Sequence, residues 1–208
     1  MAGSEVVRQA IVDDNIQQII CLVRRPMEIA HAKITTVIHN DFLNYDAVKD
    51  HFKDYDACIW CLGISQLQVT KAQYAVITYD YTIAAAKAMQ EVNPGIHFVF
   101  LSGNGADRKE KSKVLFARLK GKTENALLQL GFKKLTIARP DAIWPKHKNK
   151  SAPLAYKLVF PIFPLIEKIA PSKIIGSVEL AKALLYLAKH PQQKNTWENM
   201  DLRKLVEA

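Results

Sequence analysis

Short apolar runs alternate with helix-like patterns along this chain, and this alternation limits the fold more than any other feature. Mostly apolar runs predict strands at residues 16–23, 34–39, 57–62, 97–101 and 135–138. Amphipathic spacing predicts helices around them, at residues 4–13, 45–53, 73–91, 111–130 and 177–189. The alternation favours an α/β fold with a doubly wound parallel sheet, here as a single domain over residues 1–208.

Two arginines directly follow the first predicted strand. Ligands of doubly wound sheets bind at the carboxyl ends of the strands, so Arg24 and Arg25 fall where a ligand is expected. Guanidinium groups fit a phosphate, and two arginines without an acid at this point favour NADP over NAD. The alternative is ordinary surface charge.

The loops after later strands offer further ligand-binding groups. Asp41 can accept a hydrogen bond from an adenine amine while Phe42 flanks the ring; the alternative for Asp41 is a turn or helix cap. Gly63 lets a ligand approach the backbone closely. The hydroxyl of Ser102 suits a substrate carbonyl, and its alternative is a turn serine.

The predicted helix 111–130 carries Lys120. A lysine four residues after a tyrosine forms an acid–base pair with it, because the cation lowers the pKa of the phenol. Here that earlier position is Phe116, which has no proton to transfer. The alternative for Lys120 is a solvated helix lysine.

The three cysteines and six histidines predict neither a redox motif nor a metal site. Cys58 and Cys61 spell C-x-x-C, but side chains three apart on a strand point to opposite faces. An odd cysteine count, with no signal peptide and no long apolar segment, predicts a cytoplasmic protein that does not enter a membrane.

Residues 108–150 hold the whole excess of positive charge, with 13 Lys and Arg against 3 Asp and Glu in a chain of net charge +9. A basic segment of this kind can bind nucleic acid. Because it lacks interleaved aromatic residues and a nucleic-acid-binding motif, a solvated helix face with a basic loop is the favoured interpretation. The expected partner is therefore a small molecule and not a nucleic acid.

Six segments in order resemble the atypical short-chain dehydrogenase/reductase superfamily, and most of all its NAD(P)H-binding, Tat-interacting oxidoreductase-like subgroup. They are GSEVVRQAIVDD, CLVRRP, ACIWCLG, FLSGNGAD, LKGKTENAL and IARPDAIWP. The resemblance implies a Rossmann-type fold, an NADP cofactor and oxidoreductase chemistry on a small carbonyl or sugar-like substrate. The alternative is a protein that senses NADP(H) or binds a partner without catalysis.

The resemblance also implies roles for single residues. On the adenosine side, Gly3 matches the last glycine of the phosphate-binding turn. Arg24 and Arg25 match the residues that bind the 2′-phosphate, and Asp41 matches the adenine contact. On the nicotinamide side, the matched positions are the ribose loop Cys61, Leu62 and Gly63 and the turn Arg139 and Pro140. The expected catalytic residues are Ser102, which orients the substrate oxygen, and Lys120, which holds the nicotinamide ribose.

The chain departs from the family in two places. A first strand and two further glycines precede the position of Gly3 in the family, so we expect either a start assigned too late or a sheet with a gap and few amides for the pyrophosphate. Phe116 replaces the usual tyrosine and removes the usual proton donor. The apolar, proline-interrupted residues 151–176 predict a cover of the substrate side or a homodimer interface, with core packing as the alternative.

Overall fold

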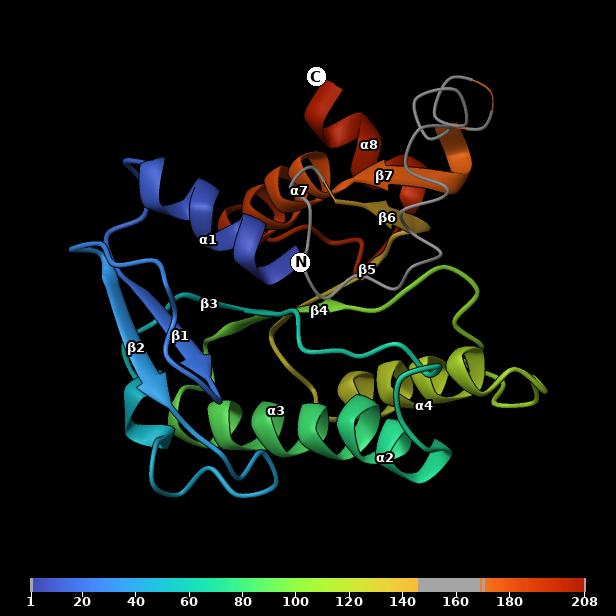
Figure 1. Cartoon of the computed structure of the whole chain (residues 1–208), viewed down its shortest axis with the longest axis horizontal. Helices are drawn as coiled ribbons and strands as arrows, with labels where there is room; N and C mark the ends of the chain where they lie inside the picture. Colours follow the sequence, from blue (N-terminus) through green and yellow to red (C-terminus); the bar gives the residue numbers. More distant parts are fainter. Residues whose placement is uncertain (1, 146–168, 170, 208) are drawn as a thin grey trace.

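The computed structural model describes residues 2–145, 169 and 171–207 (Figure 1). Its strands are β1 (Ile19–Val23), β2 (Ile34–Ile38), β3 (Ala57–Trp60), β4 (His97–Leu101), β5 (Lys134–Arg139), β6 (Ala142–Trp144), β7 (Ile174–Gly176) and β8 (Thr196–Glu198). The longer helices are α1 (Ala2–Val12), α3 (Tyr81–Val92), α4 (Leu115–Gln129), α7 (Ser177–Lys189) and α8 (Asn199–Glu207). The shorter ones are η1 (Lys49–Phe52), α2 (Lys71–Ala75), η2 (Val76–Asp80) and η4 (Pro171–Lys173). Most of the segment 151–176, with its predicted cover or interface, lies outside the described residues.

All the paired strands run parallel. The main sheet has the order β3-β4-β5-β8, and Phe98 of β4 lies opposite Cys58 on one side and Leu135 on the other. This arrangement confirms the predicted α/β class with a parallel sheet. Among the described strands, β1 and β2 pair only with each other, as do β6 and β7. That a missing first strand separates β1 from β3 stays a prediction.

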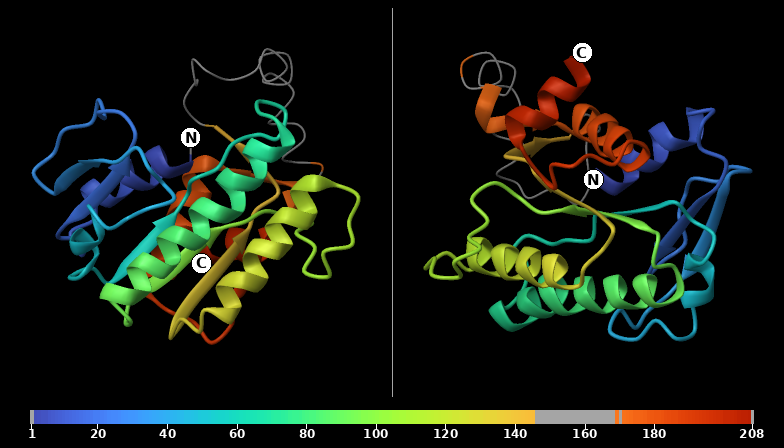
Figure 2. Two further views of the ribbon diagram at one scale, coloured as in Figure 1. Left: turned by 90° about the horizontal axis from the view of Figure 1, so that it is seen from below. Right: turned by 180° about the vertical axis from the view of Figure 1, so that it is seen from behind.

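Helices cover both faces of the main sheet, with α2, α3 and α4 on one side and α1, α7 and α8 on the other (Figures 1 and 2). Side chains alternate along β4, so Phe98 and Phe100 pack with α3 and α4 while Val99 packs with α1 and α7. The apolar run after His97 in this strand follows from burial on both faces. In the described parts of the chain, no helix has the length and apolar character needed to cross a membrane.

Four of the five predicted helices begin elsewhere than expected. The helix predicted over 4–13 begins at Ala2, and the one predicted over 45–53 is only the short 3-10 helix η1 (Lys49–Phe52). The helix predicted over 73–91 starts at Lys71, because Thr70 and Gln73 form a capping box. The helix predicted over 111–130 starts at Leu115, because the Asp107 carboxylate accepts backbone N–H groups of residues 109, 111 and 112 and holds them in a loop. β8 and α8 at the end of the chain were not predicted at all.

Candidate functional site

The carboxyl ends of β3, β4 and β5 meet the first half of α4 at one edge of the main sheet. Ser102 follows β4 and Arg139 ends β5, while Lys120 and Glu124 extend from α4 toward them. The structure therefore brings together the two residues predicted to be catalytic, Ser102 and Lys120. It adds Glu124, for which sequence reasoning gave no role.

Glu124 is fully buried and lies at the centre of a hydrogen-bonded ion cluster. Its carboxylate accepts from the Ser102 hydroxyl at 2.6 Å, from Arg108 Nε at 2.7 Å and from Arg139 Nε at 2.9 Å, and a second Arg139 nitrogen also donates to it. The carboxylate raises the pKa of the Arg139 guanidinium. These partners satisfy the hydrogen-bond acceptors of the buried carboxylate.

The hydroxyl of Ser102 is buried and gives its proton to Glu124. The predicted hydrogen bond to a substrate carbonyl needs the same proton, because a carbonyl oxygen only accepts. In this arrangement Ser102 offers an approaching ligand only its oxygen lone pairs. Its catalytic role stays a prediction.

Lys120 is 8% exposed, which rules out the solvated helix lysine offered as its alternative. Its Nζ donates to the carbonyl oxygen of Leu101 at 2.9 Å and lies 4.7 Å from the centre of the Phe100 ring. Burial lowers the pKa of Lys120 to about 8, although the charge of Glu124 and the Cys61 thiol oppose this shift. An ammonium has three N–H donors, and Leu101 is its one hydrogen-bond partner in the described residues.

Phe116 lies one turn before Lys120, with its ring against the loop after β4. A Cβ added to Gly103 would lie only 2.6 Å from the Cζ atom of Phe116, so only glycine fits beneath this ring. An apolar ring thus occupies the position where the family has a phenol. The usual proton donor is absent from this side of the site.

The amino end of α1 packs against the end of β3. A Cβ added to Gly3 would lie 3.3 Å from the Cβ of Cys61, and Figure 1 shows the first turn of α1 above this end of the strand. The first N–H groups of a helix favour phosphate. Cys61, Leu62 and Gly63 lead away from this point, and nothing lies within 4 Å of a Cβ built on Gly63.

Arg24 and Arg25 are exposed at the end of β1 and have no hydrogen bond or ion pair to the described residues. Asp41 accepts the backbone N–H of Leu43 at 3.0 Å, which is the turn geometry offered as its alternative. Phe42 is 4% exposed and packs with other aromatic rings, so its ring is a core element in this structure.

Arg139 and Pro140 form the turn after β5. Arg139 binds Glu124 and also Glu198 at 3.0 Å, so its guanidinium belongs to the ion cluster. Pro140 is buried, and its carbonyl oxygen accepts the backbone N–H of Asn104 at 2.8 Å. This turn thereby fixes the loop that follows Ser102.

The C-x-x-C cysteines lie on opposite faces of the sheet, as the strand alternation predicts. Cys58 packs with the cluster under α3, and Cys61 packs with the cluster under α1 and α7. Burial raises the pKa of each thiol to about 12, and neither forms a disulfide. No group of His, Cys, Asp and Glu within the described residues is suited to a metal ion.

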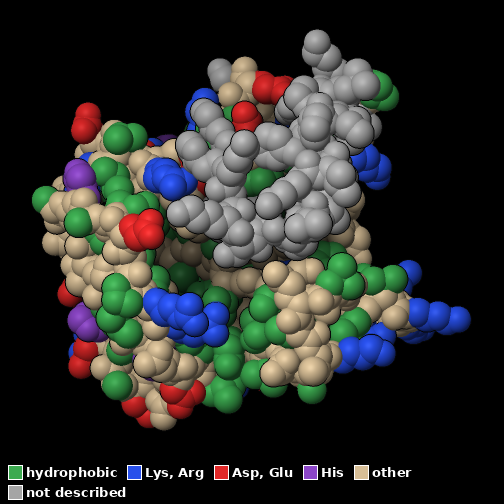
Figure 3. All heavy atoms as spheres, in the orientation of Figure 1, with side chains coloured by type: hydrophobic (Ala, Val, Ile, Leu, Met, Phe, Trp, Pro, Cys, Tyr) green, Lys and Arg blue, Asp and Glu red, His purple; other side chains and the backbone are tan. Residues whose placement is uncertain are grey.

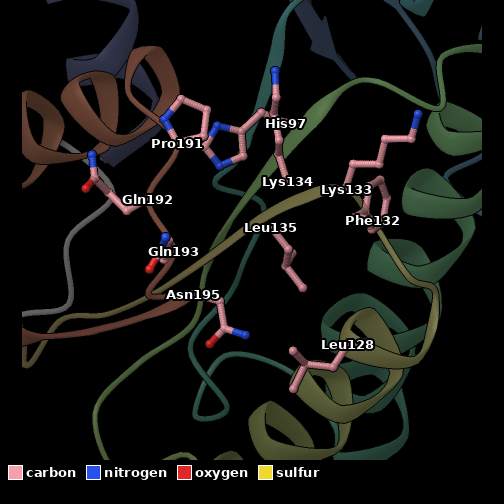
Figure 4. A pocket seen from close by; sticks show the side chains of 10 residues that line it. All are labelled: His97, Leu128, Phe132, Lys133, Lys134, Leu135, Pro191, Gln192, Gln193 and Asn195. Carbon is pink, nitrogen blue, oxygen red and sulfur yellow. The ribbon is translucent and has the colours of Figure 1, made fainter.

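A cavity of about 220 Å³ lies at the amino ends of β4 and β5, and therefore at the edge opposite to the predicted site (Figure 4). His97 on its wall uses both ring nitrogens, Nδ1 with Ala188 and Nε2 with Thr136. Figure 4 shows the side chains of Lys133 and Lys134 extending away from Asn195 and Leu128. On the face drawn in Figure 3, a separate hollow with hydrophobic side chains on its floor lies beside basic side chains.

Comparison with known sequences gives a family and several relatives. A family model described as NAD(P)H-binding matches residues 1–142. Mitochondrial protein FMP52 of Debaryomyces hansenii is 26% identical over 198 residues, covering 92% of this chain and 84% of that protein. FMP52 of Candida albicans is 27% identical over 153 residues, covering 72% and 66%. HTATIP2 of Rattus norvegicus is 27% identical over 103 residues, covering 50% of this chain and 41% of that protein.

Solved structures with a similar fold include three at 14% identity. UDP-N-acetylglucosamine 4-epimerase from Bacillus cereus superposes with a TM-score of 0.68, covering 98% of this chain and 79% of that one. WbmH of Bordetella bronchiseptica, in complex with NAD+, gives 0.69 with 95% and 71% covered. RMD of Pseudomonas aeruginosa, complexed with NADPH, gives 0.59 with 100% and 79% covered. At this identity the likeness concerns the fold alone.

The comparisons correct one prediction. We expected a cytoplasmic protein because the sequence has no signal peptide and an odd number of cysteines. The FMP52 relatives from Debaryomyces hansenii and Candida albicans are both named as mitochondrial proteins, so the cytoplasmic prediction is wrong. Free cysteines fit the mitochondrial matrix as well as the cytoplasm, since both are reducing, and composition does not separate them.

Proposed function

Because the chain belongs to the NAD(P)H-binding family, we propose that it is an oxidoreductase that uses NADP(H) to reduce a small carbonyl or sugar-like substrate. The predicted membership of the atypical short-chain dehydrogenase/reductase superfamily is confirmed by the family match, the HTATIP2 relative and the epimerase fold. The observation that carries the proposal is Lys120, a buried ammonium at the carboxyl ends of the sheet with one hydrogen-bond partner among the described residues.

Residues along this edge of the sheet suit the parts of such a cofactor. The first turn of α1 offers backbone N–H groups for the pyrophosphate beside Cys61. Arg24 and Arg25 are free to pair with a 2′-phosphate. The donors of Lys120 suit the nicotinamide ribose. When bound, the reduced cofactor supplies a hydride, and the chain binds and orients both reactants.

The preference for NADP(H) rests on the two exposed arginines, Arg24 and Arg25. We expect wild type to bind NADPH at least about tenfold more tightly than NADH, a difference of about 1.4 kcal/mol. Fluorescence titration of both nucleotides measures this, with an Arg24→Met/Arg25→Met double variant that should lose the preference. Lys87→Met, which removes an exposed lysine from α3, is the matched control. Equal affinity of wild type for both nucleotides would refute the preference.

Reduction is tested by following NADPH oxidation with a panel of aldehydes and quinones. Turnover with any of them, well above the rate without substrate, supports the proposal. A protein that binds NADPH tightly and oxidises it with none of them would contradict it.

The second candidate is a protein that binds NADP(H) and responds to it without catalysis. Two observations favour it: Phe116 takes the place of the proton donor, and the Ser102 proton is already given to Glu124. This candidate predicts tight NADPH binding and a conformational response, for example a nucleotide-dependent change in proteolysis, with no turnover.

The names of the FMP52 relatives support a mitochondrial location for this chain as well. Fractionation of cells that express the protein with a tag after α8 tests this. Recovery with a mitochondrial matrix marker supports the location, and recovery only with plasma-membrane or secreted markers would contradict it.

A further inference from the structure

Carbonyl reduction needs a proton as well as a hydride, and the usual tyrosine is replaced by Phe116. We propose that the ammonium of Lys120 is the general acid that protonates the substrate oxygen. This inference rests on the proposed oxidoreductase function. It differs from the role assigned by resemblance, which has Lys120 only hold the nicotinamide ribose.

In the ion cluster, side chains that could offer a proton to a substrate already donate it to Glu124. Ser102 donates its hydroxyl proton to Glu124 at 2.6 Å. Glu124 also accepts hydrogen bonds from two guanidinium groups, Arg108 at 2.7 Å and Arg139 at 2.9 Å. Because a guanidinium does not lose its proton in proteins, the arginines are not acids either.

Two further side chains near Lys120 are also unsuited to donate a proton. Phe116 carries none. The thiol of Cys61 holds its proton strongly, since burial raises its pKa to about 12. Among the described residues that meet here, Lys120 is left as the acid.

The contacts of Lys120 suit that role. One N–H donates to Leu101 at 2.9 Å and holds the side chain in place, while two N–H groups have no hydrogen-bond partner in the described residues. The charged and titratable groups that influence it are Glu124, one turn along α4, and Cys61 at the end of β3; Arg108 and Arg139 neutralise Glu124 from behind. A pKa of about 8 lies close to physiological pH, where a general acid works best.

When bound, the reduced nicotinamide would supply a hydride to the carbonyl carbon and would itself be oxidised, and the C=O π pair would move to oxygen. The oxygen forms an O–H bond as an N–H bond of Lys120 breaks. The neutral amine then regains a proton from water.

The first experiment compares Lys120→Arg with wild type and with Lys122→Met, a control two residues along α4 whose lysine lies over the Tyr79 ring. Arginine keeps the charge and the hydrogen-bond donors but does not release its proton. We expect Lys120→Arg still to bind NADPH, because the charge and donors toward the ribose are kept, and to lose turnover of the NADPH-saturated protein by about 100-fold or more, as removal of a general acid does. Lys122→Met should match wild type in both measurements.

The possible results distinguish failure of the acid role of Lys120 from failure of the proposed oxidoreductase function. Wild-type turnover in Lys120→Arg would refute the acid role while leaving the oxidoreductase function in place. Wild type that binds NADPH and never turns over would refute both, and would favour the sensing protein. A wild type without NADPH binding would refute the proposed function at the binding step.

The second experiment does not depend on activity. Lysines carrying ¹³C-methyl groups from reductive methylation are titrated by NMR, and the Lys120 signal is the one missing in Lys120→Arg. We expect its midpoint near pH 8, against the ordinary value of about 10.4 for a lysine in water. A midpoint with the exposed lysines would overturn the proposal.

Discussion

Lys120 and Glu124 lie one turn apart on α4, are both buried, and carry opposite charges that the fold satisfies in opposite ways. Glu124 accepts hydrogen bonds from three side chains, two of them cationic. Lys120 donates one hydrogen bond to a backbone carbonyl and otherwise lies over the Phe100 ring. Buried charges are normally paired. Glu124 has hydrogen-bond partners for its carboxylate, which indicates a structural role, whereas Lys120 has one partner among the described residues and is the candidate for chemistry.

The spacing of the two residues would allow an ion pair between them, since positions four apart share one helix face. The two side chains form no salt bridge within 4.0 Å, and the carboxylate is instead bound by Arg108 and Arg139. Arg108 and Arg139 therefore occupy the acceptor oxygens of Glu124 and hold its side chain in place. The remaining N–H donors of Lys120 stay available to a ligand.

The largest expected effect on stability comes from removing the negative charge of Glu124. Glu124→Gln leaves two guanidinium groups facing a neutral amide in a buried position, and we expect it to lower the free energy of unfolding by about 3–5 kcal/mol. Urea denaturation at neutral pH measures this. The control is Glu91→Gln, which breaks the exposed pair with Lys49 and should cost less than about 1 kcal/mol. Equal losses in the two variants would show that the Glu124 cluster contributes no more than surface charge.

Removal of the positive charge of Lys120 is expected to raise the free energy of unfolding instead of lowering it. Lys120→Met fills a similar volume without a buried charge, so we expect a more stable protein at pH 7, by up to about 3 kcal/mol for a pKa that falls from 10.5 to about 8. The lowered pKa penalises the folded state fully below pH 8. This penalty is lost as the pH rises from 8 to 10.5, so the gain over wild type should shrink over that range.

Urea unfolding of Lys120→Met and wild type at pH 7 and pH 9.5 checks both parts of this prediction. A variant that is less stable than wild type at pH 7 would show that the contacts with Leu101 and Phe100 outweigh the desolvation of the charge.

The sequence predicted the strands that form this edge of the sheet but not the different roles of Lys120 and Glu124 beside it. Short apolar runs located these strands to within two residues. β4 ends at Leu101 as predicted, whereas β3 ends at Trp60, two residues before its predicted end, and β5 ends at Arg139, one residue after it. Glu124 was missed because its partners come from a loop and from another strand, and neither is near it in sequence. One signal was available: Glu124 is the only acid in α4, an otherwise basic helix.

Phe42 illustrates a different limit. Its position after β2 suggested a ring open to the cofactor, since aromatic residues after a strand can flank an adenine. In the structure the ring packs against His39 and Tyr81. Whether a loop residue turns outward or into the core depends on neighbours from α3, which local sequence does not reveal.

The two arginines that hold Glu124 should differ in their contributions. Arg139 has a side chain that is 15% exposed and binds Glu124 through two nitrogens, whereas Arg108 is 33% exposed and binds it through one. We expect Arg139→Met to lower the free energy of unfolding by about 2 kcal/mol and Arg108→Met by about 1 kcal/mol. Thermal or urea unfolding of the pair measures the difference, and the reverse order would contradict the assignment of Arg139 as the main partner.

Ser102→Ala tests whether the Glu124 cluster takes part in the reaction, and it should have the smallest effect on the free energy of unfolding. The variant removes one neutral donor from Glu124 while both arginines stay in place, so we expect a loss of stability of about 1 kcal/mol. If the Ser102 proton stays with Glu124 during the reaction, turnover should fall far less than in Lys120→Arg, because no proton reaches the substrate from this residue. A turnover loss as large as that of Lys120→Arg would show that Glu124 releases the serine when substrate binds. The cluster would then be part of the catalytic site, and the contrast between the two charges would hold only for the free protein.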